Sequence, residues 1–309
     1  MSLVLGRAET PVERSHLGGI GLTLLSILMF AGTNALAKWL NHAVPVGELL
    51  FARAALGVLL IAPFVSRRDI AAMVAGGRPW LHALRVAASA VEVCCFYWAI
   101  SDLPLADGST IYLAGPVYVT ALSAVFLRER VGWRRWAAVV VGFVGVLVAL
   151  RPAGAVMTPH ALVAVGGSVL YAVSLVATRR LRATPNTLLA GTQMAALLLL
   201  SGASAAAGWV VPDVAEAALM AVVGVVSLLA YLCVNRGLQL APASVVAPFN
   251  YASILGAVML GYMMFGDVPA PATLVGAAII VCAGLFILLE RDDCRWNHRK
   301  SESRDKTKD

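Results

Sequence analysis

The chain has 309 residues, of which 60% are hydrophobic and only 13% are charged, and its mean hydropathy is +0.82. Soluble domains contain about 25% charged residues, so this composition excludes most soluble folds. Five cysteines in so long a chain also argue against a disulfide-rich secreted scaffold. The composition therefore predicts an all-α integral membrane protein.

Ten apolar stretches are each long enough to cross a bilayer, which takes about 20 residues of helix. The loops between them are too short to form a separate soluble domain. A polar segment, residues 1–17, precedes the first stretch, which is longer than the core of a signal peptide, so we expect no cleaved leader. The ten predicted spans are Gly18–Leu40, Pro45–Ser66, Pro79–Ile100, Leu103–Phe126, Trp133–Leu150, His160–Thr178, Thr187–Val210, Ala215–Gln239, Ser244–Phe265 and Ala270–Leu289.

The basic residues predict how the chain is oriented, because Lys and Arg gather on the cytoplasmic side of a membrane. With the N-terminus inside, all of the 24 Lys and Arg residues except Lys38, Arg53, Arg85 and Arg151 fall in cytoplasmic segments. We therefore expect both termini in the cytoplasm. The net charge of +7 then reflects topology and not nucleic-acid binding. The mixed-charge tail, residues 291–309, is expected to be a disordered stop-transfer tail, with a regulatory role as the alternative.

Two segments of the chain resemble one another. Both Leu105–Val131 and Leu240–Pro269 begin with Leu-Ala, carry a Ser four residues after the Leu, and reach an acid, Glu129 or Asp267, before the next span. The match places residues 18–150 in correspondence with residues 151–290. Five helices per copy would invert the second copy, and inverted repeats place a substrate site at the interface of the repeats. The sequence thus predicts ten transmembrane helices as two inverted five-helix repeats around a central cavity.

Four segments carry a resemblance to a known family: FAGTNALAKWL, PVGELLFARAALGVL and, most specifically, LAGPVYVTALSAVFLRER and ASVVAPFNYASILGAVMLGYMMFGD. Through them the chain resembles the drug/metabolite transporter superfamily, EamA-type, over about residues 18–290. The resemblance implies a basket of ten helices around a central cavity. Ile254 stands where the family often has a Pro matching Pro116, so the ninth helix is expected to be less kinked than the fourth, and Asp267 replaces the more usual Glu.

Polar residues of the third span form one stripe. His82, Arg85, Ser89, Glu92 and Phe96 recur at steps of three or four and are expected to face a cavity, since charge at membrane depth is costly. Arg85 and Glu92 lie about 10 Å apart along the helix axis, too far to pair directly. Glu92 is the first candidate for a carboxylate that takes up and releases a proton. Pairing of each residue with a neighbouring helix, for packing, is the alternative.

The first two spans add four polar residues. Asn34 and Lys38 are one turn apart on one face, and Asn34 is a candidate cavity residue. Lys38 is long enough to reach the outer surface near Glu48, so a Lys38–Glu48 ion pair is expected, with gating or substrate contact as the alternative. Arg53 lies deeper, and its candidate partners are Glu92 and an anionic group of the substrate.

Aromatic residues and prolines complete the candidate site. Tyr97 and Trp98, at the outer end of the third span, are expected in the interfacial aromatic belt. Prolines inside helices cause kinks, so two of them are candidate hinges. Further candidates to line the cavity are Tyr112, Tyr171, Asn250 and Tyr251, and the hinge candidates are Pro116 and Pro248.

The sequence contains no CxxC, no His pair at metal spacing, no nucleotide-binding loop and no GxSxG. We therefore expect no metal, no cofactor and no enzyme activity, and a secondary mechanism driven by a proton gradient or by the substrate's own gradient. An integral membrane enzyme or a sensor is the alternative from another class.

The resemblance implies a transporter of the bacterial inner membrane that moves a small polar metabolite by alternating access. We expect export of an amino-acid-derived compound, namely an amino acid, a related zwitterion or an opine-type metallophore. Uptake of a riboflavin-like or S-adenosylmethionine-like solute is the alternative. The expected partners are the substrate, the lipid bilayer and, as a candidate coupling ion, the proton. Nucleic acid is not expected, and the protein is expected to be a monomer or a homodimer.

Overall fold

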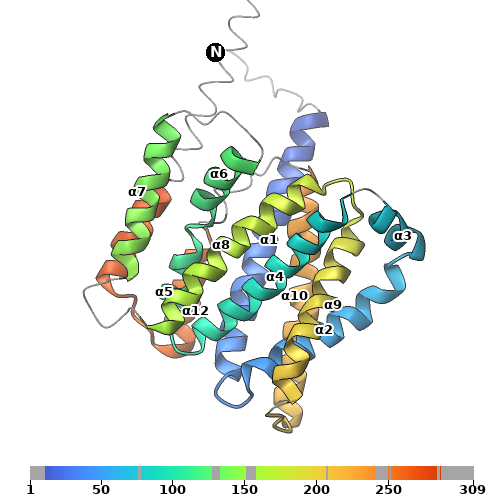
Figure 1. The fold of residues 1–309 in the computed structure, drawn as a ribbon. Helices are drawn as coiled ribbons and strands as arrows, with labels where there is room; N and C mark the ends of the chain where they lie inside the picture. The colour runs from blue at the N-terminus through green and yellow to red at the C-terminus, as the bar shows by residue number, and fades with distance from the viewer. Residues whose placement is uncertain are drawn as a thin grey trace, which may run out of the picture.

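The computed structural model describes residues 11–75, 78–126, 133–150, 158–206, 208–240, 250, 252–283 and 286. Within these ranges every regular element is a helix, and the long helices stand side by side in one bundle (Figure 1). In chain order the helices are α1 (Pro11–Leu40), α2 (Val46–Ile61), η1 (Ala62–Phe64), α3 (Arg67–Ala75), α4 (Pro79–Ile100), α5 (Leu105–Tyr112), α6 (Gly115–Phe126), α7 (Trp133–Leu150), α8 (Pro159–Arg180), α9 (Asn186–Ala206), α10 (Val214–Leu240) and α12 (Ala252–Phe265), and then the helix Pro271–Ala283.

Six of these helical segments are long and apolar enough to cross a membrane. They are Leu17–Leu40 within α1, Val46–Phe64 across α2 and η1, and the helices α4, α8, α9 and α10. The prediction of an all-helical, multi-pass membrane protein is confirmed at this level. The helices α4 and α7 begin and end where the sequence pattern placed the third and fifth spans.

The fourth predicted span differs from the observed helices. It is divided into α5 and α6, with Leu113 and Ala114 between them and Pro116 at the second position of α6. A proline is tolerated in the first turn of a helix and cannot supply the backbone N–H that an interior position requires, which gives a physical reason for the interruption. Among the observed elements, α3 was not predicted. It is short, carries Arg67, Arg68 and Asp69, and lies at the opposite edge of the bundle from α7 (Figure 1).

The helices pack in a regular set of pairs. The helix α1 lies along α10, α4 lies along α8, and α2 lies along α9. In addition, α1 contacts α12 and α6 contacts α8, while α2 contacts α10 and α4 contacts α9. Helices of the first half of the chain therefore pack mainly on helices of the second half.

Glycines allow two of these pairs to approach closely. A Cβ on Gly237 of α10 would stand 2.6 Å from the hydroxyl of Thr23 and 3.0 Å from the carbonyl oxygen of Gly19, both on α1. A Cβ on Gly57 of α2 would stand 2.8 Å from the sulfur of Met194 on α9. Small residues at crossings are typical of membrane helices, whose association depends on close van der Waals contact.

Candidate functional site

A cavity of about 1280 Å³, including its open mouth, lies among the helices α1, α2, α4, α5, α8, α9, α10 and α12. Most of the residues predicted to line a cavity do line it. These are Asn34, Arg53, Arg85, Glu92, Tyr112, Tyr171 and Asn250. The structure therefore brings together side chains from both halves of the chain, up to more than 200 residues apart in sequence.

Arg53 projects from α2 and is 1% exposed. Its Nη1 donates to the hydroxyl of Tyr97 at 2.6 Å, and its guanidinium carbon lies 5.1 Å from the Tyr97 ring centroid and 5.6 Å from that of Tyr231. Its Nε is buried and has no acceptor among the described residues. Gly224 of α10 packs closely on this part of α2, since a Cβ there would lie 3.1 Å from the Cδ2 of Leu56 and 3.4 Å from the Cα of Arg53.

Arg85 projects from α4 and is also 1% exposed. In contrast to Arg53, each of its three nitrogens donates a hydrogen bond: Nε to the Thr178 hydroxyl at 2.9 Å, Nη1 to the Leu189 carbonyl at 3.0 Å, and Nη2 to the Gln193 side-chain oxygen at 3.4 Å. These acceptors belong to α8 and α9, and all of them are neutral. Arg85 thus ties three helices together at one wall of the cavity.

Glu92 is 8% exposed and shares the cavity wall with Arg53, with which it interacts electrostatically. Its backbone carbonyl accepts a hydrogen bond of 3.1 Å from the hydroxyl of Tyr112. Gly167 of α8 leaves room for that hydroxyl, because a Cβ at this position would overlap it and would lie 2.8 Å from the Cβ of Cys95.

Aromatic rings cover much of the remaining wall. Tyr112 meets Phe96 edge to face at 4.9 Å between ring centroids, and it meets Tyr171 at 6.2 Å. Phe30 and Tyr231 form a second edge-to-face pair at 5.0 Å. Such rings offer a ligand apolar surface and hydroxyl groups together.

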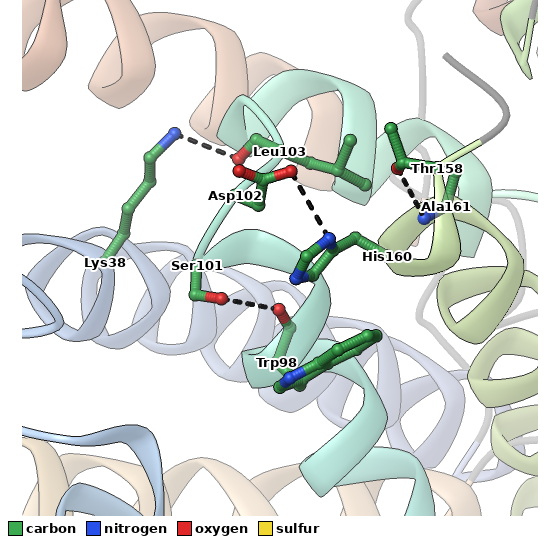
Figure 2. Close-up of polar contacts among 8 residues, drawn as sticks. All are labelled: Lys38, Trp98, Ser101, Asp102, Leu103, Thr158, His160 and Ala161. Carbon is green, nitrogen blue, oxygen red and sulfur yellow. Dashed lines mark hydrogen bonds and ion pairs between the residues drawn. The ribbon is translucent and has the colours of Figure 1, made fainter.

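The predicted Lys38–Glu48 ion pair is wrong. The ammonium of Lys38 binds the carboxylate of Asp267 at 3.0 Å and the carbonyl oxygen of Leu103 at 3.1 Å, and Figure 2 shows its side chain reaching toward Leu103. Glu48 is fully buried and instead accepts a hydrogen bond of 3.0 Å from the backbone N–H of Val210. Asp267 follows α12, which packs on α1, so the correct partner lies far away in sequence.

The predicted interfacial position of Tyr97 is also wrong. Tyr97 is 2% exposed because Arg53 holds its hydroxyl inside the bundle. The neighbouring Trp98 is 40% exposed and stacks on His160, with ring centroids 4.1 Å apart (Figure 2). The Nδ1 of His160 lies 3.3 Å from the carboxylate of Asp102 in the same cluster.

Four further candidates do not contribute side chains to this description of the cavity. Ser89 is buried but is not among the lining residues, because its hydroxyl donates to the carbonyl oxygen of Val86 in its own helix at 3.2 Å. Tyr251 and Pro248 lie outside the described residues, and of Pro116 only the backbone is described.

Sequence reasoning missed several polar residues of the wall. Thr178, Gln193 and Asn235 line the cavity and are at most 5% exposed. Each is a polar residue within a predicted span, and this is the signal that could have identified them. Within the described ranges, no cluster of three or more His, Cys, Asp or Glu side chains could hold a metal ion.

Apolar helices that surround a ligand-sized cavity, lined by apolar surface and several buried polar groups, define the general class, a multi-pass membrane protein with a site for a solute. The model of the EamA-like transporter family matches the chain at residues 17–151 and again at residues 158–289. The chain belongs to this family, as its motifs predicted, and the family assigns it to the transporters.

Relatives that match along most of the chain are named as transporters of different solutes. A riboflavin transporter of Rhizobium johnstonii is 29% identical, over 89% of this chain and 92% of that protein. An S-adenosylmethionine uptake transporter of Rickettsia bellii is 26% identical, over 87% of this chain and 93% of that protein. The pseudopaline exporter CntI of Pseudomonas aeruginosa is 30% identical, over 86% of this chain and 94% of that protein. A solved crystal structure with a TM-score of 0.62 and 21% identity, covering 88% of this chain and 96% of its own, shares the fold.

Proposed function

We propose that this protein is a secondary transporter of the bacterial inner membrane that exports a small amino-acid-derived compound by alternating access. The observation that carries the proposal is the cavity, whose wall combines the cations Arg53 and Arg85, the carboxylate of Glu92 and several aromatic rings. A ligand with both signs of charge and an apolar body, such as an amino acid or a related zwitterion, suits this wall. Membrane-embedded charges that face a cavity typically mark a substrate or ion pathway.

The alternating-access mechanism rests on a second proposal, that ten helices form two inverted repeats, residues 18–150 and 151–290. The packing pairs support it. If α1 corresponds to α8, α4 to α10 and α6 to α12, exchanging the two halves converts the α1–α10 pair into the α8–α4 pair. It also converts the α1–α12 pair into the α8–α6 pair, and all four contacts are present. The turns Asn41–Pro45 and Leu181–Pro185 have equal length and follow α1 and α8. The family model also matches the chain twice, once in each half.

In this mechanism both termini are cytoplasmic, and the Lys38–Asp267 pair closes the periplasmic end of the cavity. The pair joins α1 to the segment after α12, two parts that would have to separate when the cavity opens outward. Glu92 is the candidate proton carrier, because it is the carboxylate described at the cavity wall. Pro116, beside the break between α5 and α6, and Pro248 are the candidate hinges.

The direction of transport is tested by comparing metabolites in cells and spent medium of a deletion strain and an overexpressing strain. Export predicts a compound that accumulates inside the deletion strain and outside the overexpressing strain. A compound that the deletion strain leaves in the medium would instead establish uptake, as in the relatives named as uptake transporters.

A transport assay tests the site. Counterflow of the identified compound in proteoliposomes is expected to be lost in Arg85→Ala and strongly reduced in Glu92→Gln. Unchanged counterflow in both variants would contradict the assignment of this cavity. Turnover of the compound without movement across the membrane would favour an enzyme.

A further inference from the structure

We infer that the ligand of this cavity carries a carboxylate and that Arg53 is the residue that binds it. The inference rests on the proposed function and deepens it, since it assigns a chemical class to the substrate and distinguishes the roles of the two buried arginines.

The charges of the described wall are unbalanced. Arg53, Arg85 and Glu92 line the cavity, so two cations face one carboxylate. The Lys38–Asp267 pair is satisfied within itself and does not line the cavity. Because a buried charge without a counter-charge is costly, the excess positive charge favours a ligand that brings a negative one.

The hydrogen bonds distinguish the two arginines by their Nε atoms. The Nε of Arg85 donates to an acceptor on α8, and its two η-nitrogens each donate one of their two N–H groups to acceptors on α9. Arg53 donates from Nη1 to Tyr97, while its Nε is buried without an acceptor. A buried donor left unpaired is costly, so this Nε has a strong requirement for an acceptor.

The geometry of a guanidinium suggests the form of that acceptor. Arginine binds carboxylates through two parallel N–H donors along one edge of its plane, and this arrangement adds specificity as well as energy. Tyr97 occupies Nη1, and the rings of Tyr97 and Tyr231, with centroids 5.1 and 5.6 Å from the guanidinium carbon, restrict its movement. The Nε edge is therefore oriented before a ligand binds, which lowers the ordering cost of binding.

The rest of the wall indicates what the carboxylate is attached to. Phe30, Phe96, Tyr112 and Tyr171 supply an apolar and aromatic surface, and Glu92 faces the same space. A carboxylate on an apolar body is thus the minimum ligand, and an amino group beside it would be bound by Glu92.

The test uses four probes with one phenyl body and different charges: L-phenylalanine, L-phenylalanine amide, L-phenylalanine methyl ester and 3-phenylpropionate. Their binding to the purified full-length protein in nanodiscs is measured by ligand-dependent thermal stabilisation at millimolar concentration. We expect the two carboxylates to bind and the amide and ester to bind at least tenfold more weakly. Equal binding of all four, stronger binding of the amide or ester, or no binding by the folded protein would overturn the inference.

Variants then assign the role to Arg53. Arg53→Gln is expected to weaken carboxylate binding at least tenfold and to remove the difference between acid and amide, while Arg53→Lys retains part of it. Arg85→Gln is expected to lower thermal stability, because it loses the hydrogen bonds to α8 and α9, and to reduce the ratio between acid and amide less than Arg53→Gln does. Arg236→Gln, at an exposed position of α10 outside the cavity wall, is the matched control and should bind like the native protein. A preference for acids that survives in Arg53→Gln would overturn the assignment.

The two proposals can fail separately. Vectorial transport of a compound without a carboxylate would refute the inference and leave the transporter intact. Arg53-dependent binding of carboxylates without any counterflow would refute the transporter and leave the binding site.

Discussion

A single methyl group at Gly167 is predicted to disturb the cavity wall, whereas the same change at its neighbour Gly166 is not. Both glycines lie in α8, but Gly166 is exposed and a Cβ there meets nothing within 4 Å. A Cβ on Gly167 would overlap the hydroxyl of Tyr112 and stand 2.8 Å from the Cβ of Cys95. Either Tyr112 must leave the carbonyl oxygen of Glu92 or α8 must move away from α4.

The magnitude follows from comparing the two variants. Replacing Gly by Ala inside a helix gains about 0.8–1 kcal/mol from helix propensity, and this gain is common to Gly166→Ala and Gly167→Ala. Overpacking a close contact costs about 1–3 kcal/mol and applies to Gly167→Ala alone. Gly167→Ala should therefore be less stable than Gly166→Ala by about 1–3 kcal/mol, and it should also weaken ligand binding.

The measurement is the free energy of unfolding of each variant in mixed micelles, with Tyr112→Phe added to form a double-mutant cycle. Removing the hydroxyl frees part of the space, so Tyr112→Phe should recover part of the loss in Gly167→Ala, with a coupling of about 0.5–3 kcal/mol. Cys95 remains in contact, so recovery should be incomplete. If Gly167→Ala is as stable as Gly166→Ala, or if the two changes are additive, the proposed contact does not control this wall.

Three further predictions concern polar contacts. In a double-mutant cycle on the free energy of unfolding, Lys38→Gln and Asp267→Asn should couple by about 0.2–1 kcal/mol, as expected for a partly exposed ion pair, and less at high salt. Additive effects of the two changes would contradict the ion pair. Tyr97→Phe removes the hydrogen-bond acceptor of Arg53 and should lower stability by about 1–3 kcal/mol, whereas the control Tyr262→Phe, at a residue that is 64% exposed, should change little. Equal effects of the two variants in thermal unfolding would refute the role of Tyr97. Asp107→Ala and Thr273→Ala each break the same hydrogen bond of 2.6 Å between α5 and the helix Pro271–Ala283, so the double variant should be only slightly less stable than either single variant. If the two losses of stability add fully in chemical unfolding, the residues act independently and the prediction is wrong.

Much of the architecture could be predicted from the sequence. Long apolar stretches predict membrane helices because lipid offers the backbone no hydrogen-bond partners, and the bounds of α4 and α7 follow from this rule. The helical period also places Arg85 and Glu92 of α4 on one inward face, and both line the cavity. The short amphipathic helix α3 could not be predicted by this rule, because it is too polar and too short to resemble a membrane span.

The partners of those side chains were decided by the tertiary structure. A period of 3.6 residues states which face of a helix is polar, but it does not state which helix stands opposite. The sequence therefore favours the nearby Glu48 as the ion-pair partner of Lys38, although the packing of α12 on α1 brings Asp267 to it. It likewise favours a position of Tyr97 at the membrane–water interface, although α2 brings Arg53 to its hydroxyl inside the bundle. In the sequence, Arg53 and Arg85 are both simply charged residues within predicted spans. The packing of α8 and α9 against α4 gives each nitrogen of Arg85 a hydrogen-bond acceptor, whereas no described residue accepts a hydrogen bond from the Nε of Arg53. Hydrogen bonds of this kind depend on where neighbouring helices approach in space, which a single helical period does not contain.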